Sequence, residues 1–258
     1  MFLVFSFLGF GGGLLSGWLG IGGGIVMAPL LLYAPALLGV DHLTMKEVAG
    51  LTMVQGFFAA LSGGLAHSRR GLVCKKLILY MGSSIVVGSS IGSVLSKFVQ
   101  AEQLKGLFAA LALIAASLML LPKREGGPIE DAESVVFHRG LAFFIPLILG
   151  FLLGMVGQAG AFILIPVMLY VLKIPTRIAI GSSLGIVFLS ASAGLFGKAI
   201  TGQVPILPAS ALVLGALAGA QVGGYFSVRT RSEALRHALA FLIALVAVGM
   251  WFELAVGR

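Results

Sequence analysis

Long apolar runs, separated by short polar segments, recur along the whole sequence. They cover 1–40, 48–66, 77–95, 104–121 and 141–172, and three more follow residue 178. A helix needs about 20 apolar residues to cross a bilayer, so most of these runs are long enough to span it. Hydrophobic residues make up 59% of the chain, charged residues only 10%, and the mean hydropathy is +1.10. A soluble core could not absorb so much apolar sequence, and we therefore predict an all-α polytopic membrane protein.

The basic residues lie mainly in the short loops between the apolar runs. The net charge is +8, from 17 Lys and Arg residues against 9 Asp and Glu residues. In a soluble chain this excess would indicate nucleic acid, but here the orientation of the spans in the bilayer explains it, so we expect no nucleic-acid partner. Cys74 is the sole cysteine, and the basic residues beside it indicate a reducing, cytoplasmic face.

The chain contains two copies of one module. Residues 13–33 align with 150–170 without a gap, and five identical pairs support the alignment: Gly17/Gly154, Gly20/Gly157, Gly23/Gly160, Pro29/Pro166 and Tyr33/Tyr170. After a loop that is six residues longer in the first copy, the match continues through Gly50/Gly181, Gly63/Gly194, Gly71/Gly202, Gly88/Gly219, Gly92/Gly223 and Ser96/Ser227. We predict a first transmembrane repeat at 1–121, a polar cytoplasmic linker at 122–138 and a second transmembrane repeat at 139–258.

Each copy begins with a long apolar segment that glycines interrupt. Three ordinary spans follow it, near 47–67, 77–97 and 104–121 and near 178–198, 206–228 and 235–255. If the interrupted segment crosses once, the copies are parallel and the basic residues divide nine to eight between the two sides. If it forms a hairpin or re-enters, the copies are inverted and the division is twelve inside to five outside. Because inside loops are rich in Lys and Arg, we expect two inverted repeats, each a glycine-broken helical segment plus three transmembrane helices, with both termini outside.

The two glycine-rich breaks, 20–24 and 157–161, are the first candidates for function. Glycines disfavour helix by roughly 1 kcal/mol each, and unpaired backbone groups are tolerated in a membrane only when they face protein or a wet cavity. A helix that starts at about Gly24 or Ala161 would point free N–H groups and its positive dipole end inward, which favours an anion. The alternative for glycines four residues apart is close helix packing, and we expect packing for two such stripes: Gly9, Gly13 and Gly17, and Gly215, Gly219 and Gly223.

Neutral polar side chains flank the breaks and could donate hydrogen bonds to an oxyanion without the cost of a buried charge. The alternative for each is a hydrogen bond between helices. The predicted substrate-binding residues are Gly22, Gly23, Gly24, Thr52, Gln55, Gln158, Ala159, Gly160, Ser182 and Ser183.

The acidic residues are all absent from the middle of the spans. A carboxylate proton relay or a cation site would need one there, so both are disfavoured. His, Cys and carboxylate residues could not converge at one depth to form a hydrolytic or metal centre. We therefore expect no enzyme activity, no metal and no cofactor.

The breaks, the duplication and Gly181-Ser-Ser-Leu184 resemble the TauE/SafE family of membrane transporters, also called sulfite exporters. The family's pattern of Gly-x-Gly-Gly-Gly, a few apolar residues and Pro is met by Gly20-Ile-Gly-Gly-Gly-Ile-Val-Met-Ala-Pro29. The resemblance covers nearly the whole chain and implies transport of sulfite, sulfoacetate or other small organosulfur or organic anions. The second copy has Gln158 and Ala159 where the first has Ile21 and Gly22, so the two halves present different groups.

The preferred hypothesis is a secondary transporter of a small anion, such as sulfite or an organosulfonate, in the cytoplasmic (inner) membrane of a bacterium. A channel-like uniporter or a carrier of another small solute is one alternative, and a non-transporting scaffold subunit is another. An open polar pocket between the two breaks would argue against the scaffold. The bilayer and a small anionic substrate are the expected partners, and the sequence leaves a homodimer open.

Overall fold

The protein is a bundle of helices in the computed structural model, which describes residues 2–21, 24–39, 43–68, 73–121, 135, 137–157 and 161–256. The helices are α1 (Phe2–Leu19), α2 (Gly24–Leu37), α3 (Met45–Ser68), α4 (Lys75–Leu95), α5 (Ala101–Met119), α6 (Arg139–Val156), α7 (Ala161–Pro166), α8 (Thr176–Ile200), α9 (Ile206–Arg229) and α10 (Ser232–Val256). A 3-10 turn, Ser96–Phe98, extends α4, and a π-helical turn, Val167–Val171, extends α7.

Seven helices of the described part are long and apolar enough to cross a membrane, which makes the chain a multi-pass membrane protein: α1, α4, α5, α6, α8, α9 and α10. Helix α3, with 24 residues, runs among them and at about 1.5 Å per residue is also long enough to span. The six ordinary spans predicted from the apolar runs are all present as helices. Most of the predicted linker at 122–138 lies outside the described residues.

Both predicted helix breaks are present. Helix α1 ends at Leu19 and α2 begins at Gly24, while α6 ends at Val156 and α7 begins at Ala161. Gly20 and Gly157 follow the ends of α1 and α6 with φ of 71° and 78°. Glycine enters this left-handed conformation without the steric cost that a Cβ imposes, so the paired glycines terminate the first helix of each half.

The predicted glycine stripes do pack helix against helix. A Cβ built on Gly9, Gly13 or Gly17 of α1 would lie closer than 3.0 Å to a backbone carbonyl of α9. The reverse holds for Gly215, Gly219 and Gly223 of α9 against α1. The equivalent helices of the other pair behave alike, since Gly88 and Gly92 of α4 meet α6, and Gly150 and Gly154 of α6 meet α4. Each first helix therefore packs in backbone contact on a helix from the other half of the sequence.

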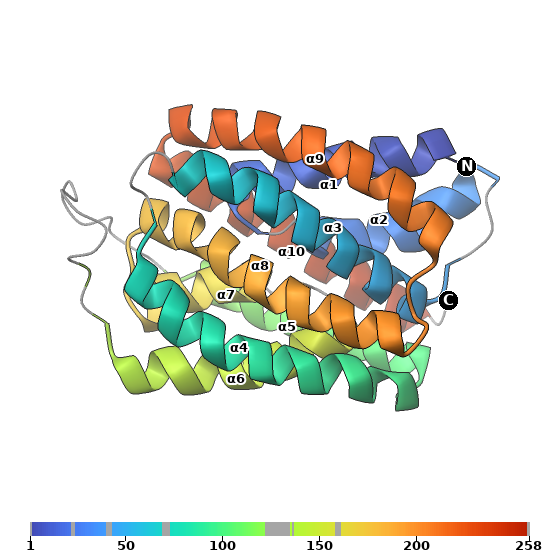
Figure 1. Cartoon of the computed structure of the whole chain (residues 1–258), viewed down its shortest axis with the longest axis horizontal. Helices are drawn as coiled ribbons and strands as arrows, with labels where there is room; N and C mark the ends of the chain where they lie inside the picture. Colours follow the sequence, from blue (N-terminus) through green and yellow to red (C-terminus); the bar gives the residue numbers. More distant parts are fainter. Residues whose placement is uncertain are drawn as a thin grey trace.

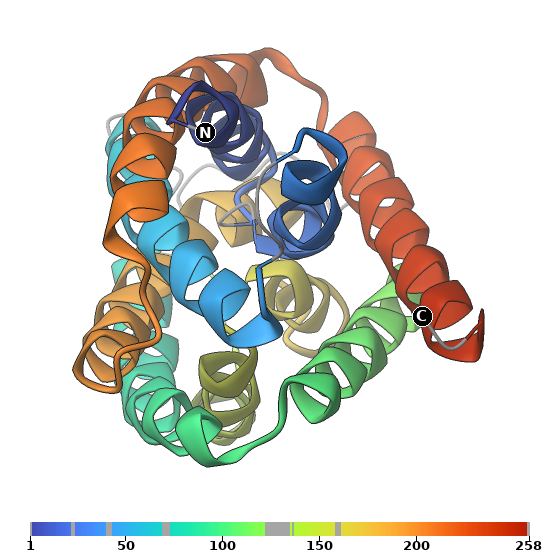
Figure 2. The ribbon, with the colours of Figure 1, turned by 90° about the vertical axis from the view of Figure 1, so that its right-hand side faces the viewer.

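The halves are interleaved across the whole bundle. Helix α1 packs mainly on α9, α6 on α4, and α3 on α8. Viewed end-on, α2 and α7 lie near the centre and the longer helices surround them (Figure 2). The start of α1 and the end of α10 lie at one end of the bundle, and the end of α5 and the start of α6 lie at the other (Figure 1).

Candidate functional site

The first break is fastened to α8. The Ser183 hydroxyl donates to the carbonyl oxygen of Gly20 at 2.7 Å. A Cβ on Gly20 would lie 2.7 Å from the carbonyl oxygen of Ile180 and 2.9 Å from the Ser183 hydroxyl, so the chain leaves α1 in direct contact with α8. Ser183 is fully buried, and this contact therefore lies inside the bundle.

The second break is fastened to α3 in the same way. The Thr52 hydroxyl donates to the carbonyl oxygen of Gly157 at 2.6 Å, and a Cβ on Gly157 would collide with the backbone of Ala49. Thr52 and Ser183 are equivalent positions in the sequence repeat, as are Ala49 and Ile180. Each break is thus held by the same kind of contact to the other half of the chain.

Each of these hydroxyls has one proton and several acceptors within reach. Thr52 also lies 3.0 Å from the Val48 carbonyl oxygen and 3.1 Å from that of Ala49. Ser183 lies 2.7 Å from the Ile180 carbonyl oxygen. In this conformation both hydroxyl protons are therefore directed to backbone carbonyls.

Ser182 points to a different place. Its hydroxyl oxygen accepts from the backbone N–H of Cys74 at 2.9 Å, just before the first residue of α4. Neighbouring residues on a helix point about 100° apart, which separates Ser182 from Ser183. Ser182 and the free thiol of Cys74 are both buried.

Gln55 has a different environment from the three hydroxyls. It is fully buried in α3, and neither amide atom has a hydrogen-bond partner within the part of the chain that the structure describes. A Cβ on Gly12 of α1 would collide with its Nε2 and would lie 2.5 Å from the Met27 side chain of α2. The amide therefore lies where α1, α2 and α3 meet. Leaving such a group without a partner costs about 1–3 kcal/mol.

The remaining predicted residues belong to the breaks themselves. Gly24 is buried and is the first residue of α2. Gly22 and Gly23 lie outside the described residues, as do Gln158, Ala159 and Gly160.

Lys198 is a buried lysine near the end of α8, although it is one of the five basic residues that the predicted topology places in outside loops. Its side chain is fully buried in α8. The ammonium donates to Ser96 Oγ at 2.7 Å, to the Met155 carbonyl oxygen at 3.0 Å and to Gln203 Oε1 at 3.1 Å. Met155 lies in the last turn of α6, where a cation stabilises the exposed carbonyls and the negative end of the helix dipole. The sequence signal that could have indicated a buried Lys198 was the presence of the polar residues Ser96 and Gln203 near the ends of neighbouring helices.

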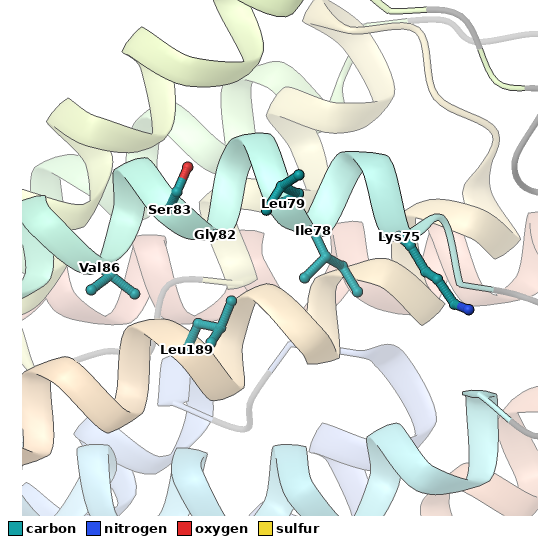
Figure 3. Close-up of a pocket in the computed structure, with 7 residues that line it drawn as sticks. All are labelled: Lys75, Ile78, Leu79, Gly82, Ser83, Val86 and Leu189. Atoms are coloured by element: carbon teal, nitrogen blue, oxygen red, sulfur yellow. The ribbon is translucent and has the colours of Figure 1, made fainter.

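No group of three or more His, Cys, Asp and Glu residues within the described ranges could hold a metal ion. Two surface grooves present a mostly apolar surface. One, of about 390 Å³, lies between α4 and α8, where Ile78 and Val86 point toward α8 and Leu189 points back (Figure 3). The other, of about 430 Å³, lies between α1 and α9. Neither groove includes a residue predicted to bind substrate.

The comparisons with known proteins agree with one another. The family described as Sulfite exporter TauE/SafE matches residues 5–250. "Probable membrane transporter protein YunE" of Bacillus subtilis is 27% identical over an alignment of 270 residues, which covers 98% of this chain and 98% of that protein. "Probable membrane transporter protein YdhB" of the same organism is 26% identical and covers 93% of this chain and 96% of its own.

A third relative, "Probable membrane transporter protein" of Xylella fastidiosa, is 26% identical over 94% of this chain and 91% of its own. No solved structure matches the chain significantly.

Proposed function

Because this chain belongs to the sulfite exporter TauE/SafE family and is a membrane transporter, we propose that it is a secondary transporter of a small anion. Sulfite, or an organosulfonate or organic anion such as sulfoacetate, is the proposed substrate. The proposed location is the cytoplasmic (inner) membrane of a bacterium, where the chain crosses the bilayer several times.

The paired attachment of the two breaks carries this proposal. Thr52 holds the carbonyl of Gly157, and its repeat equivalent Ser183 holds the carbonyl of Gly20. Secondary transporters built from internal repeats bind solute where two discontinuous helices meet, and they work by moving one repeat against the other. In this chain each half holds the broken helix of the other half by a hydrogen bond. A movement of one half relative to the other would therefore also move the two breaks, as that mechanism requires.

The surroundings of the breaks favour an anion over a cation. Residues 2–37, which include α1, the first break and α2, contain no Asp, Glu, Lys, Arg or His. The side chains of α3 and α8 that bond to the break glycines, Thr52 and Ser183, are neutral hydroxyls. The buried Lys198 of α8 bonds instead to Met155 in the last turn of α6. Without a carboxylate, a metal cation or proton would have no counter-charge, whereas neutral donors and helix N-termini stabilise an anion. The ten residues predicted from the sequence form the proposed binding region, some by contact with the anion and some by holding the breaks: Gly22, Gly23, Gly24, Thr52, Gln55, Gln158, Ala159, Gly160, Ser182 and Ser183.

We also propose that the halves are inverted in the membrane, with the 122–138 linker in the cytoplasm. Repeat-equivalent contacts at opposite ends of the bundle support this. Lys46 at the start of α3 donates to the Lys97 carbonyl oxygen at 2.8 Å. Its equivalent Arg177, at the start of α8, reaches the equivalent carbonyl oxygen of Val228 at 3.5 Å.

Transport by purified protein in proteoliposomes tests the proposal. We expect saturable uptake or efflux of labelled sulfite or sulfoacetate, absent from protein-free liposomes and unaffected by an excess of small cations. A scaffold subunit would give no flux of any solute. Non-saturating flux would identify a channel instead of a carrier.

A further inference from the structure

Two polar side chains near the first break are buried and have no hydrogen-bond partner among the described residues. They are Gln55 of α3, with both amide atoms unpaired, and Ser16 of α1, with its hydroxyl unpaired. Both residues are fully buried. Buried polar groups in native proteins are nearly always paired, so an exception requires an explanation. Neither side chain is used in the contacts that hold the breaks.

The Gln55 amide packs on the face of α1 that carries Ser16. Gly12 of α1 lies directly against the Gln55 amide and the Met27 side chain. Ser16 follows Gly12 by four residues and therefore lies on the same face of α1, one turn further toward the break. Met27 lies in the first turn of α2, whose N–H groups have no partner within the helix. Gln55, Ser16 and the start of α2 thus converge between α1, α2 and α3.

The second half does not repeat this arrangement. Ile186 stands at the position equivalent to Gln55, Leu153 at that of Ser16 and Leu149 at that of Gly12. The hydroxyls that hold the breaks, Thr52 and Ser183, are present in both halves. The hydroxyls that hold the breaks are therefore duplicated, whereas Gln55 and Ser16 have apolar residues at the equivalent positions of the second half.

We propose that Gln55 and Ser16, together with the first-turn N–H groups of α2, form the contact that binds the anion, and that Thr52 and Ser183 position the breaks. This inference rests on the proposed function and assigns its binding site to the first half. The amide and hydroxyl supply donors but no positive charge, and a neutral buried site compensates the desolvation of one charge more readily than of two. Among the proposed substrates, the ligand is therefore a singly charged oxyanion such as hydrogen sulfite, in preference to a dianion such as sulfoacetate.

The decisive variant is Gln55→Leu, because substrate binding and packing predict opposite effects on stability. Removing an unpaired buried amide relieves a cost, so the melting temperature in detergent should be unchanged or higher. Hydrogen sulfite, offered at a pH where the monoanion dominates, should stabilise the unmodified protein but not the variant. We expect affinity to fall roughly tenfold or more, as for loss of a donor to a charged group.

Ser16→Ala should give the same pattern, and Ser190→Ala is the matched control. Ser190 also has a buried, unpaired hydroxyl, but it lies on α8, where the Ser89 hydroxyl of α4 donates to its carbonyl oxygen. We expect Ser190→Ala to retain anion binding and uptake.

Three results would overturn the inference. The first is wild-type anion affinity in both Gln55→Leu and Ser16→Ala, with uptake by the unmodified protein intact. The second is a Gln55→Leu protein that is clearly less stable than the unmodified one, since this would assign the amide to packing. The third is the absence of anion uptake by the unmodified protein, which would remove the proposed function as well and so is distinguishable from the other two.

Discussion

The first helix of each half ends at one glycine with a left-handed backbone, Gly20 in the first half and Gly157 in the second. Each of these glycines also lies against another helix. At Gly157 a side chain would meet the backbone of Ala49, and at Gly20 it would meet Ile180 and Ser183. Gly202 also has a positive φ, of 72°, but has no atom within 4 Å of a built Cβ. A comparison of Gly157 with Gly202 therefore separates two effects of adding a side chain: the strain of a left-handed backbone, which both positions share, and the collision with a neighbouring helix, which occurs at Gly157 alone of the two.

Gly157→Ala should therefore destabilise the protein more than Gly202→Ala. Both variants incur the left-handed penalty of roughly 1–2 kcal/mol, but only the first pushes α3 away from the second break. Thermal unfolding in detergent measures the difference. An equal loss of thermal stability in both variants would mean that a side chain at Gly157 does not displace α3, contrary to this prediction.

The hydroxyls of Thr52 and Ser183 permit a second test at this scale. Thr52→Val keeps the shape but leaves the Gly157 carbonyl without its 2.6 Å donor, so we expect a loss of about 1–3 kcal/mol in unfolding free energy. Thr52→Ser keeps the hydroxyl and should recover most of that stability. Equal instability of the Ser and Val variants would attribute the effect to packing of the methyl group.

Between helices, backbone contact holds together the two most extensively packed pairs. In a bilayer the lipid is as apolar as the side chains, so association depends on close packing. The α1–α9 pair and its repeat equivalent α6–α4 achieve this with glycines facing carbonyl groups. The first helix of each half is thereby anchored to the opposite half, next to the break that follows it.

Gly219→Ala should loosen the α1–α9 pair, because its Cβ would collide with the Phe10 carbonyl oxygen. Gly106 on α5 is the matched control, since nothing lies within 4 Å of its built Cβ. There alanine should be neutral or should stabilise by up to about 1 kcal/mol through helix propensity. Melting temperatures of the two variants decide between the expectations, and a stable Gly219→Ala protein would contradict the packing role.

Much of this element-level architecture follows from local sequence. Apolar runs locate the spans, and glycine clusters locate the breaks, because both depend on helix propensity and transfer to lipid. Which helix a glycine stripe meets is a tertiary matter, so the stripe on α1 predicted packing but not α9 as its partner. Ser182 and Ser183 are neighbours in the sequence, yet their rotation on α8 sends one to Cys74 and the other to Gly20. The burial of Lys198 likewise depends on acceptors from three separate segments.

For the molecule as a whole, we infer the orientation of the bundle in the membrane from the basic residues that lie together at each of its ends. Arg177 donates to the Thr230 carbonyl oxygen at 3.2 Å, which brings the starts of α8 and α10 together. Lys46 and Lys97 lie together at another point, where α3 begins and α4 ends. By the positive-inside rule, the starts of α8 and α10, with Arg177, should be cytoplasmic. The start of α3 and the end of α4, with Lys46 and Lys97, should be external.

Single cysteines in a Cys74→Ser background test this orientation. The native thiol is buried and would report poorly, whereas Lys97, Lys173 and Arg231 are exposed. Lys173→Cys and Arg231→Cys should react with an impermeant maleimide only when the cytoplasmic face is accessible, and Lys97→Cys only from outside intact cells. Because Lys173 follows the second broken segment, its reaction from the same side as Lys97 would mean that this segment crosses once and that the halves are parallel.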